Sequence, residues 1–362
     1  LDFERTFPGA VTIRLEQNYR STRNILDAAN AVIAHNVARK GKTLWSERDA
    51  GARLLFALTP DETFEARRVR HWLQRQQTRG RRMAATAEDI VRFYSGIVGD
   101  SPYPSLAVGL VEKDLPGGHS PAYLSVLYQP MPQGNFSWAN DPAAFPNYPE
   151  FFVAHEIAHQ WWGQAVAWRN YHEQWISEGF AQYFAALYAQ RSRGEQAFQD
   201  VLVRMTRFAR DQSAQGPISL GYRLGHIKGD SRVFRALVYN KSAVVLHNLR
   251  LLLGDDVFFR GVRRFYVGWR FRKACTADVR QAFETESGQD LEAFFEGWIH
   301  TSGVPVVKFS WSREGDGAAA VAVVRFEQVG TALDLPIPVT VRYADGTSQE
   351  VIVPVRARTA EL

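Results

Sequence analysis

Apolar residues recur at helical spacing through most of the chain and alternate with polar residues near its C-terminal end. Spacings of three and four residues predict a helix over residues 21–40, with Ser21 as its N-cap and Gly41 just past its end. A second, basic helix is predicted over residues 62–77. Period-two alternation predicts four strands that would form a small β-sandwich, over residues 304–311, 319–326, 337–343 and 349–355.

Breaks in this pattern mark the end of an N-terminal segment. Extended stretches are expected over residues 11–15 and 53–58, and the basic run at residues 78–82 is interpreted as a junction. Thr86, followed three residues later by Asp89, fits a capping box that would start a new helix. The pattern therefore separates a segment that ends near residue 80 from the remainder of the chain.

The central part of the chain changes from strands to helices. Two strands are expected over residues 106–112 and 122–129, on either side of a loop rich in glycine and proline. A helix over residues 151–162 follows, with Gly163 positioned to stop it. From residue 177 to residue 303 the pattern is mostly helical.

The composition is that of a globular protein, with 46% hydrophobic and 22% charged residues. A length of 362 residues allows two or three domains. Cys275 is the only cysteine, which excludes an intramolecular disulfide framework and a zinc site built from thiolates. Any metal must therefore be held by histidine and carboxylate side chains. No apolar run reaches the roughly 18 residues of a membrane span.

The net charge of +5 is distributed unevenly along the chain. Residues 1–82 hold 16 Lys and Arg against 9 Asp and Glu, which leaves +7 there and −2 in the remainder. Such asymmetry suggests a nucleic-acid-type segment joined to a body of different character, although charge alone favours a solvated helical face.

The sharpest chemical feature is the pattern HEIAH, which begins at His155 inside the predicted central helix. Residues four apart share one face of a helix, so His155 and His159 can bind the same zinc ion, and Glu156 lies beside them. A catalytic zinc usually takes three protein ligands, and Glu178 is the candidate for the third. The 18 residues between His159 and Glu178 suffice for a turn and a returning antiparallel helix.

These residues resemble the gluzincin metallopeptidases of the aminopeptidase N family, whose mark is HExxH, 18 residues and then Glu, here within SEGFA. The resemblance implies that His155, His159 and Glu178 bind one Zn²⁺ ion. It implies that Glu156 is the general base, which takes a proton from the attacking water and passes it to the leaving amine. The family's V/I-Y-x-K-G motif is matched by VYNKS, which makes Tyr239 the expected stabiliser of the oxyanion.

One loop departs from the family pattern. Family members carry G-x-M-E-N before the zinc helix, and the Glu of that motif binds the free α-amine of the substrate. This chain has Gly117, Gly118, His119 and Ser120 in the corresponding loop, with Ser120 where that Glu would stand. These four residues are expected to line the substrate site. Hydrolysis is expected to survive, whereas a preference for a free N-terminus no longer follows.

Residues 1–80 resemble a different family, the UvrD/Rep type of superfamily-one DNA helicases, through EQNYRST, NILDAAN and GKTLW. The resemblance implies that Tyr19 stacks on adenine and that Arg20 contacts the γ-phosphate. Both roles need a Walker A loop and an acidic Mg²⁺ motif, and neither motif occurs in these 362 residues. The segment is therefore expected to be a fragment, joined by gene fusion, recombination or faulty sequence assembly.

The two resemblances predict an α+β multidomain chain in three parts. Residues 1–80 would be a small α/β helicase-like fragment. Residues 82–303 would be a thermolysin-like zincin catalytic domain with a helical lobe, and residues 304–362 a β-sandwich.

Three functions follow as expectations. The first is zinc-dependent hydrolysis of peptide bonds in a peptide or protein substrate, aminopeptidase-like but with the amine-anchoring Glu replaced by Ser120. The second is an ATP-dependent DNA helicase or its DNA-binding remnant, against which the missing Walker motifs argue, so that we expect no functional nucleic-acid binding by the basic segment. The third is a zinc-binding protein that captures peptides without cleaving them. The helicase-like fragment favours the cytoplasm, and Leu1 suggests that the natural start lies upstream.

Overall fold

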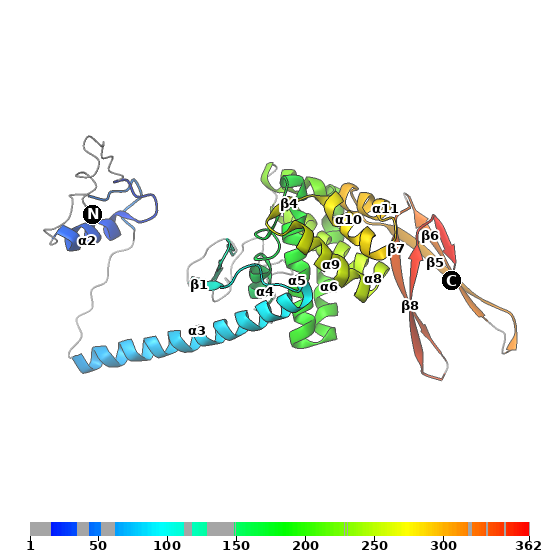
Figure 1. Ribbon diagram of the computed structural model, residues 1–362, viewed down its shortest axis with the longest axis horizontal. Coiled ribbons are helices and arrows are strands. Elements are labelled where there is room, and N and C mark those ends of the chain that lie inside the picture. Colours follow the sequence, from blue (N-terminus) through cyan, green and yellow to red (C-terminus); the bar gives the residue numbers. More distant parts are fainter. Residues whose placement is uncertain are drawn as a thin grey trace. The chain divides into compact units, whose positions relative to one another are not determined.

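The computed structural model divides the chain into two compact units, Leu1–Gln77 and Thr78–Leu362 (Figure 1). The structure describes most of both units, in the ranges 16–34, 43–51, 62–111, 118–128, 148, 150–227, 229, 231–317, 321–330, 332–343 and 345–361. The expected extended stretches at 11–15 and 53–58, the helix stop Gly41 and the candidate site residue Gly117 lie outside these ranges.

The first unit contains helix α2, Arg23–Ala34, which lies inside the predicted helix over residues 21–40. Leu26 on its apolar face is buried. The Asn30 amide ties this helix to a neighbouring segment, because it donates to the Leu44 carbonyl (2.7 Å) and accepts from the Leu44 backbone N–H (3.1 Å). A single parallel bridge between Gln17 and Trp45 completes the described part of this unit.

Helix α3, Glu62–Val98, corrects the predicted helix ends on either side of residues 78–82, whereas the division into two compact units falls between Gln77 and Thr78, beside the expected junction. The structure has one continuous helix where a junction and a new capped start at Thr86 were expected. The interruption rested on Gly80 and a run of arginines, but glycine inside a helix costs only about 1 kcal/mol and arginine, methionine and alanine are strong helix formers. At the C-terminal end of α3, Ile90, Tyr94 and Val98 bury one face at a spacing of four.

Strands β1, Ala107–Val111, and β2, Leu124–Tyr128, confirm the two predicted central strands. They pair in parallel, with Ala107 opposite Leu124. On the other side of β2, His119 forms an antiparallel bridge with Val126. Helix α4, Glu150–Ala158, packs against β2, and most of its residues are buried. A helix that is apolar nearly all round is expected in the interior of a domain.

The remaining helices confirm the predicted helical stretch between residues 177 and 303. They are α5 Trp175–Arg193, α6 Glu195–Gln212, α7 Ser231–Phe234, α8 Ser242–Leu253, α9 Asp255–Trp269, α10 Thr276–Ser287 and α11 Glu292–Phe295. A short parallel pair, β3 Val166–Trp168 and β4 Arg272–Ala274, joins the segment before α5 to the segment between α9 and α10. The core is rich in large aromatic side chains that the turn after α4, α5 and α9 bring together, among them Trp162, Phe180 and Phe265.

The C-terminal strands confirm the four predicted from alternation and add a fifth. Three of them, β5 Val306–Glu314, β6 Val321–Val329 and β9 Thr359–Glu361, form one antiparallel sheet. The other two, β7 Leu335–Arg342 and β8 Ser348–Val355, form a second antiparallel sheet. Figure 1 shows both beside the helical body. The β-sandwich itself stays a prediction.

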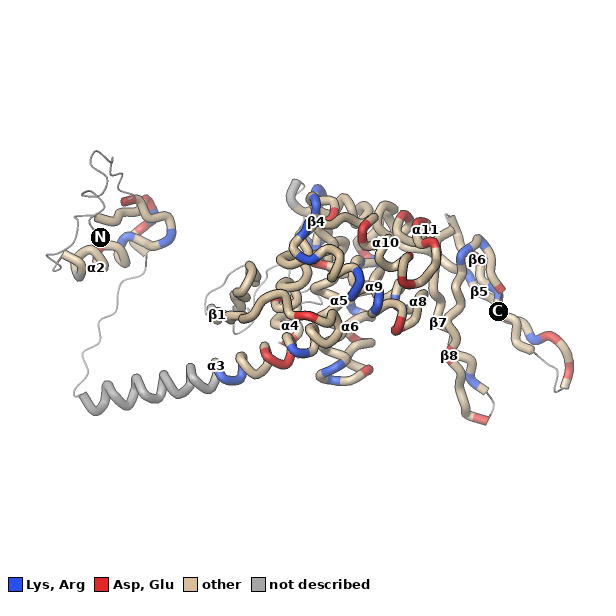
Figure 2. The backbone as a smooth tube through the Cα atoms, viewed as in Figure 1, with Lys and Arg blue, Asp and Glu red and all other residues tan. Residues whose placement is uncertain are grey.

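Figure 2 shows Lys and Arg interspersed with Asp and Glu over the helices of the second unit. Several form ion pairs on the surface, such as Arg260 with Glu286 at 3.1 Å. Among the residues that the structure describes, no helix is both long and apolar enough to cross a membrane.

Candidate metal centre and active site

The two histidines of HEIAH lie at the C-terminal end of α4, which ends at Ala158, four residues before the predicted end. The next turn tightens, because the N–H groups of Gln160 and Trp161 bond to carbonyls three residues back (3.0 Å each). Gly163 then reverses the chain at φ +114°, a conformation that glycine adopts at little cost. His159 therefore stands in the tightened turn, yet its side chain still meets that of His155.

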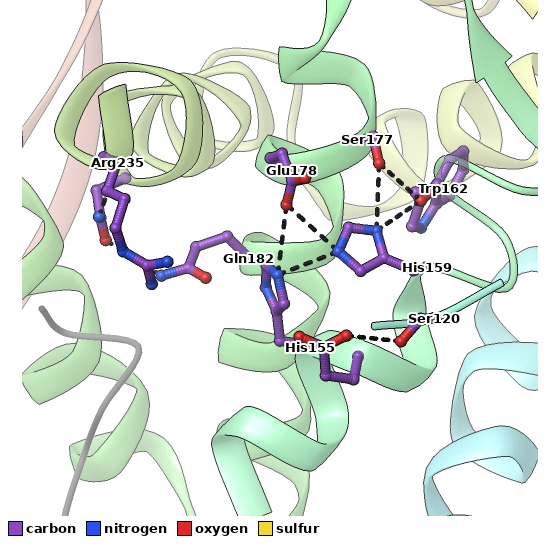
Figure 3. Close-up of polar contacts among 10 residues, drawn as sticks. Ser120, His155, His159, Trp162, Ser177, Glu178, Gln182 and Arg235 are labelled. Atoms are coloured by element: carbon purple, nitrogen blue, oxygen red, sulfur yellow. Dashed lines mark hydrogen bonds and ion pairs between the residues drawn. The ribbon is translucent and has the colours of Figure 1, made fainter. Parts of the chain in front are cut away.

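Three side chains converge on one point at this turn. The Nε2 atoms of His155 and His159 lie 3.2 Å apart. Oε2 of Glu178, in the first turn of α5, lies 3.5 Å from the first and 3.3 Å from the second (Figure 3). Within the described part of the chain, no other group of three His, Cys, Asp or Glu side chains comes this close.

This triangle fits a zinc ion. Tetrahedral zinc with bonds of about 2.0–2.1 Å to nitrogen and oxygen has ligand atoms roughly 3.3–3.4 Å apart. The three observed separations, 3.2–3.5 Å, fall around that value. Glu178 Oε2 is buried and accepts no hydrogen bond from any described residue. A cation held by the three side chains would satisfy that oxygen.

Hydrogen bonds fix the orientation of the His159 ring. Its Nδ1 lies 2.9 Å from the Trp162 carbonyl, and because a carbonyl can only accept, Nδ1 carries the hydrogen and Nε2 keeps its lone pair for a metal. The Ser177 hydroxyl lies 3.2 Å from the same Nδ1 and donates to the same carbonyl (3.1 Å). The metal-facing tautomer of His159 is thus set by the chain that surrounds it (Figure 3).

The electrostatics of the triad favour a bound cation. Burial lowers the pKa of His159, but the negative charge of the nearby Glu178 raises it overall to about 9. Burial raises the pKa of Glu178, and the two imidazoles outweigh that effect and hold it far below its usual range. Glu178 is therefore an anion that attracts positive charge to the point where the three side chains meet.

Tyr239 reaches the same site from a π-helical turn, Arg235–Lys241, that directly precedes α8. Its ring stacks on His155, with centroids 5.7 Å apart and an interplanar angle of 16°. The guanidinium of Arg235 lies 4.9 Å from the Tyr239 ring centroid. Burial raises the pKa of Tyr239 well above its usual value, and the charge of Glu178 raises it further. The phenol is therefore a neutral hydrogen-bond donor.

Glu156 is buried on α4, and its Oε2 accepts a hydrogen bond of 2.6 Å from the Ser120 hydroxyl. Gly118, His119 and Ser120 line one cavity of about 370 Å³ together with Glu156, the metal triad and Tyr239. The structure thus brings every candidate peptidase residue into one place, except Gly117, which lies outside the described residues.

The two candidate nucleotide-binding residues lie in the other unit. Tyr19 is largely exposed, and its hydroxyl donates to the Gln17 side chain (2.8 Å). The Arg20 backbone N–H donates to the Asn18 side chain (2.9 Å). Both residues belong to a local turn that lies just before the start of α2 at Arg23.

Sequence reasoning missed the residues that support the metal ligands. Ser177 stands next to Glu178 in SEGFA, but its contact with His159 spans 18 positions. Gly163 was noted only as a helix stop, whereas a Cβ at this position would lie 2.4 Å from the Ser177 hydroxyl oxygen. No sequence pattern predicted Arg235 as a residue of the site, because its place in the cavity depends on the π-helical turn.

Comparison with known proteins divides the chain in the same way. Residues 148–298 match the Peptidase family M1 domain. Residues 13–90 match the UvrD-like helicase C-terminal domain, which supports the helicase-like fragment and extends past its predicted end at residue 80, within α3. The first match includes both histidines, Glu178 and Tyr239, and it confirms the predicted class of enzyme domain, a zinc metallopeptidase.

Curated relatives agree on this class. Aminopeptidase N of Lactococcus lactis subsp. lactis is 29% identical over 173 residues, which are 46% of this chain and 20% of that protein. Tricorn protease-interacting factor F2 of Thermoplasma volcanium is 28% identical over 193 residues, which are 52% of this chain and 24% of that protein. The chain thus spans about a fifth to a quarter of the length of these relatives.

A solved structure shares the fold. The aminopeptidase A of Legionella pneumophila, crystallised with aspartic acid, superposes with a TM-score of 0.58 at 18% identity and covers 77% of this chain and 32% of that one. At this level of identity the likeness concerns the fold alone. It supports the expected mixed helix and sheet architecture.

Proposed function

We propose that this protein hydrolyses peptide bonds with one zinc ion held by His155, His159 and Glu178. The observation that carries the proposal is the triangle of ligand atoms with edges of 3.2, 3.3 and 3.5 Å, which opens onto the cavity that contains Glu156 and Tyr239. When bound, zinc supplies Lewis acidity that activates water near neutral pH and polarises the peptide carbonyl.

The chain's own residues divide the remaining work. Glu156 is the general base: it accepts the proton of the attacking water and delivers it to the amine that leaves. Tyr239 lines the same cavity as the triad and, as a neutral phenol, donates a hydrogen bond to the oxyanion that develops on the carbonyl. Arg235, whose guanidinium lies over the Tyr239 ring, keeps the phenol oriented.

The substrate's N-terminal amine is a separate question. Among described residues, the carboxylates that line the cavity are Glu156 and Glu178, and both already have partners. Ser120 carries no charge that would attract an ammonium group. We therefore propose an aminopeptidase-like site with a weakened demand for a free amine, which cleavage of one peptide in free and N-acetylated forms would test. Cleavage of the free form alone would contradict the weakened demand.

The general-base role has a sharp test. Glu156→Gln keeps the shape of the side chain but cannot accept a proton, so turnover should fall by at least about 10³-fold while the protein still binds one equivalent of zinc. Glu150→Gln is the matched control, because Glu150 lies on the same helix and pairs with Arg193 outside the cavity. Chelator-sensitive cleavage that survives in Glu156→Gln would rule out the assigned base, and absence of any cleavage by the wild type would favour the peptide-capture alternative.

A further inference from the structure

Residues 118–120 form an extended segment that contacts the side chain of Glu156, the proposed general base, from one side. Residues two apart in an extended segment face the same way, and here Gly118 and Ser120 face Glu156 while His119, between them, is exposed. The His119 backbone exchanges two hydrogen bonds with Val126 of β2, at 3.1 and 2.8 Å. The segment is therefore held in register against the sheet.

The two inward positions contact different oxygens of the Glu156 carboxylate. Oε2 accepts the 2.6 Å hydrogen bond from Ser120, and both side chains are more than nine-tenths buried. A Cβ at position 118 would lie 2.3 Å from Oε1 and 2.2 Å from Cδ, so only glycine leaves room for the carboxylate as it stands. Ser120 therefore holds the Glu156 carboxylate by a hydrogen bond, and Gly118 leaves the space that the carboxylate occupies.

A buried charge-assisted hydrogen bond of this length restricts the carboxylate to one rotamer. Among the described residues that line the cavity, no other side chain donates a hydrogen bond to the Glu156 carboxylate. The Ser125 hydroxyl donates only to the backbone carbonyl of Glu156, at 3.4 Å. Without Ser120 the carboxylate would be free to rotate about its last torsion, which is broad for glutamate.

We propose that Ser120 is a positioning residue, which holds Oε2 of Glu156 so that Oε1, beside Gly118, is the oxygen that receives the proton of the attacking water. This inference rests on the proposed function. It assigns to position 120 a role toward the base on α4, in place of a role toward the substrate's amine. The proton moves from water to Oε1, and the Ser120 hydroxyl keeps its own hydrogen throughout.

The test compares Ser120→Ala and Ser120→Thr in the full chain loaded with zinc. Loss of the hydroxyl should lower kcat about 10- to 100-fold with KM changed less than about twofold, as for other residues that orient a catalytic group. Threonine keeps a hydroxyl and should restore most of the activity. Zinc content, measured by atomic absorption, should equal that of the wild type in both variants. Ser125→Ala is the matched control, since that buried hydroxyl contacts the main chain of the same glutamate.

Each outcome bears on a different statement. Equal kcat in Ser120→Ala and wild type would overturn the positioning role. An equal loss of kcat in Ser120→Ala and Ser120→Thr would overturn it too, because it would show that the packing of the side chain matters and the hydroxyl does not. Loss of zinc in Ser120→Ala would also overturn it, because the residue would then support the metal site. Absence of chelator-sensitive cleavage by the wild type itself would overturn the proposed function, and this inference with it.

Discussion

At the scale of single residues, the metal site depends on Gly163, a glycine that supplies no metal ligand. Gly163 adopts φ +114°, and its missing side chain is the space in which the Ser177 hydroxyl meets His159. The turn after α4 therefore serves two purposes: it ends the helix, and it lets α5 approach closely enough for Glu178 to reach the histidines.

Gly163→Ala should weaken zinc binding about 10-fold or more and destabilise the fold by about 1–3 kcal/mol, because the new methyl group would displace Ser177 from His159. Gly194→Ala provides the control: Gly194 also has positive φ, at +86°, but has open space around it. Competition with a chelating dye measures the zinc affinity of both variants. An equal effect in the two would show that backbone strain, and not the contact with Ser177, governs the site.

A half-buried histidine away from the site makes stability depend on pH. Burial and the nearby Arg250 lower the pKa of His247 to about 4, while the Tyr183 hydroxyl lies 3.3 Å from its Nδ1. The unfolded chain takes up this proton near pH 6.5 and the folded chain only near pH 4, so the His247 contribution is complete above pH 6.5 and is lost as pH falls toward 4.

The predicted loss over that range is up to about 3 kcal/mol. His247→Gln should therefore reduce the fall in unfolding free energy between pH 7 and pH 4, as measured by urea denaturation at each pH. His300→Gln is the control, because His300 is partly exposed and lies 3.9 Å from Glu296 on the surface. Identical pH profiles for His247→Gln and the wild type would refute the assignment.

At the scale of elements, the site is held by the close packing of α5 against α8. Glu178 lies in the first turn of α5, and Tyr239 lies just before α8. A Cβ on Gly179 would lie 2.5 Å from the Ser242 Cβ, so the two helices approach at a point where one side has no side chain. This contact sets the distance between a metal ligand and the expected oxyanion donor.

Gly179→Ala should destabilise the protein by about 1–3 kcal/mol through overpacking, in spite of the better helix propensity of alanine. Removal of the opposing Cβ by Ser242→Gly should partly rescue it, so the double-mutant cycle should show a favourable coupling. Gly268→Ala, in α9 with nothing near its Cβ, is the control and should be neutral or slightly stabilising. Additive effects of the two substitutions would refute the contact.

At the scale of the whole molecule, the large core belongs to one unit. The buried apolar residues that form it run from Ala87 to Val355, and all of them lie in Thr78–Leu362, as do all described residues of the metal site. The helicase-like part contributes none of its described residues to either.

A chain that starts at Thr78 should therefore bind one equivalent of zinc, with a melting temperature within about 3 °C of the full chain. Calorimetry with and without a chelator measures both properties. A truncated chain that loses zinc or melts much earlier would show that the first unit stabilises the peptidase-like part.

The sequence by itself determined what depends on local spacing. Helical period put His155 and His159 on one face, the run of apolar residues made α4 a buried helix, and alternation located the C-terminal strands, because each of these is decided by neighbours within a few residues.

Tertiary structure decided the rest. The parallel pairing of β1 with β2 and the contacts of residues 118 and 120 with Glu156 depend on groups 17 or more positions apart, and the continuity of α3 and the tightened turn at His159 depend on competing small preferences. Packing settles such choices, since its contacts outweigh the fractions of a kcal/mol by which local propensities differ.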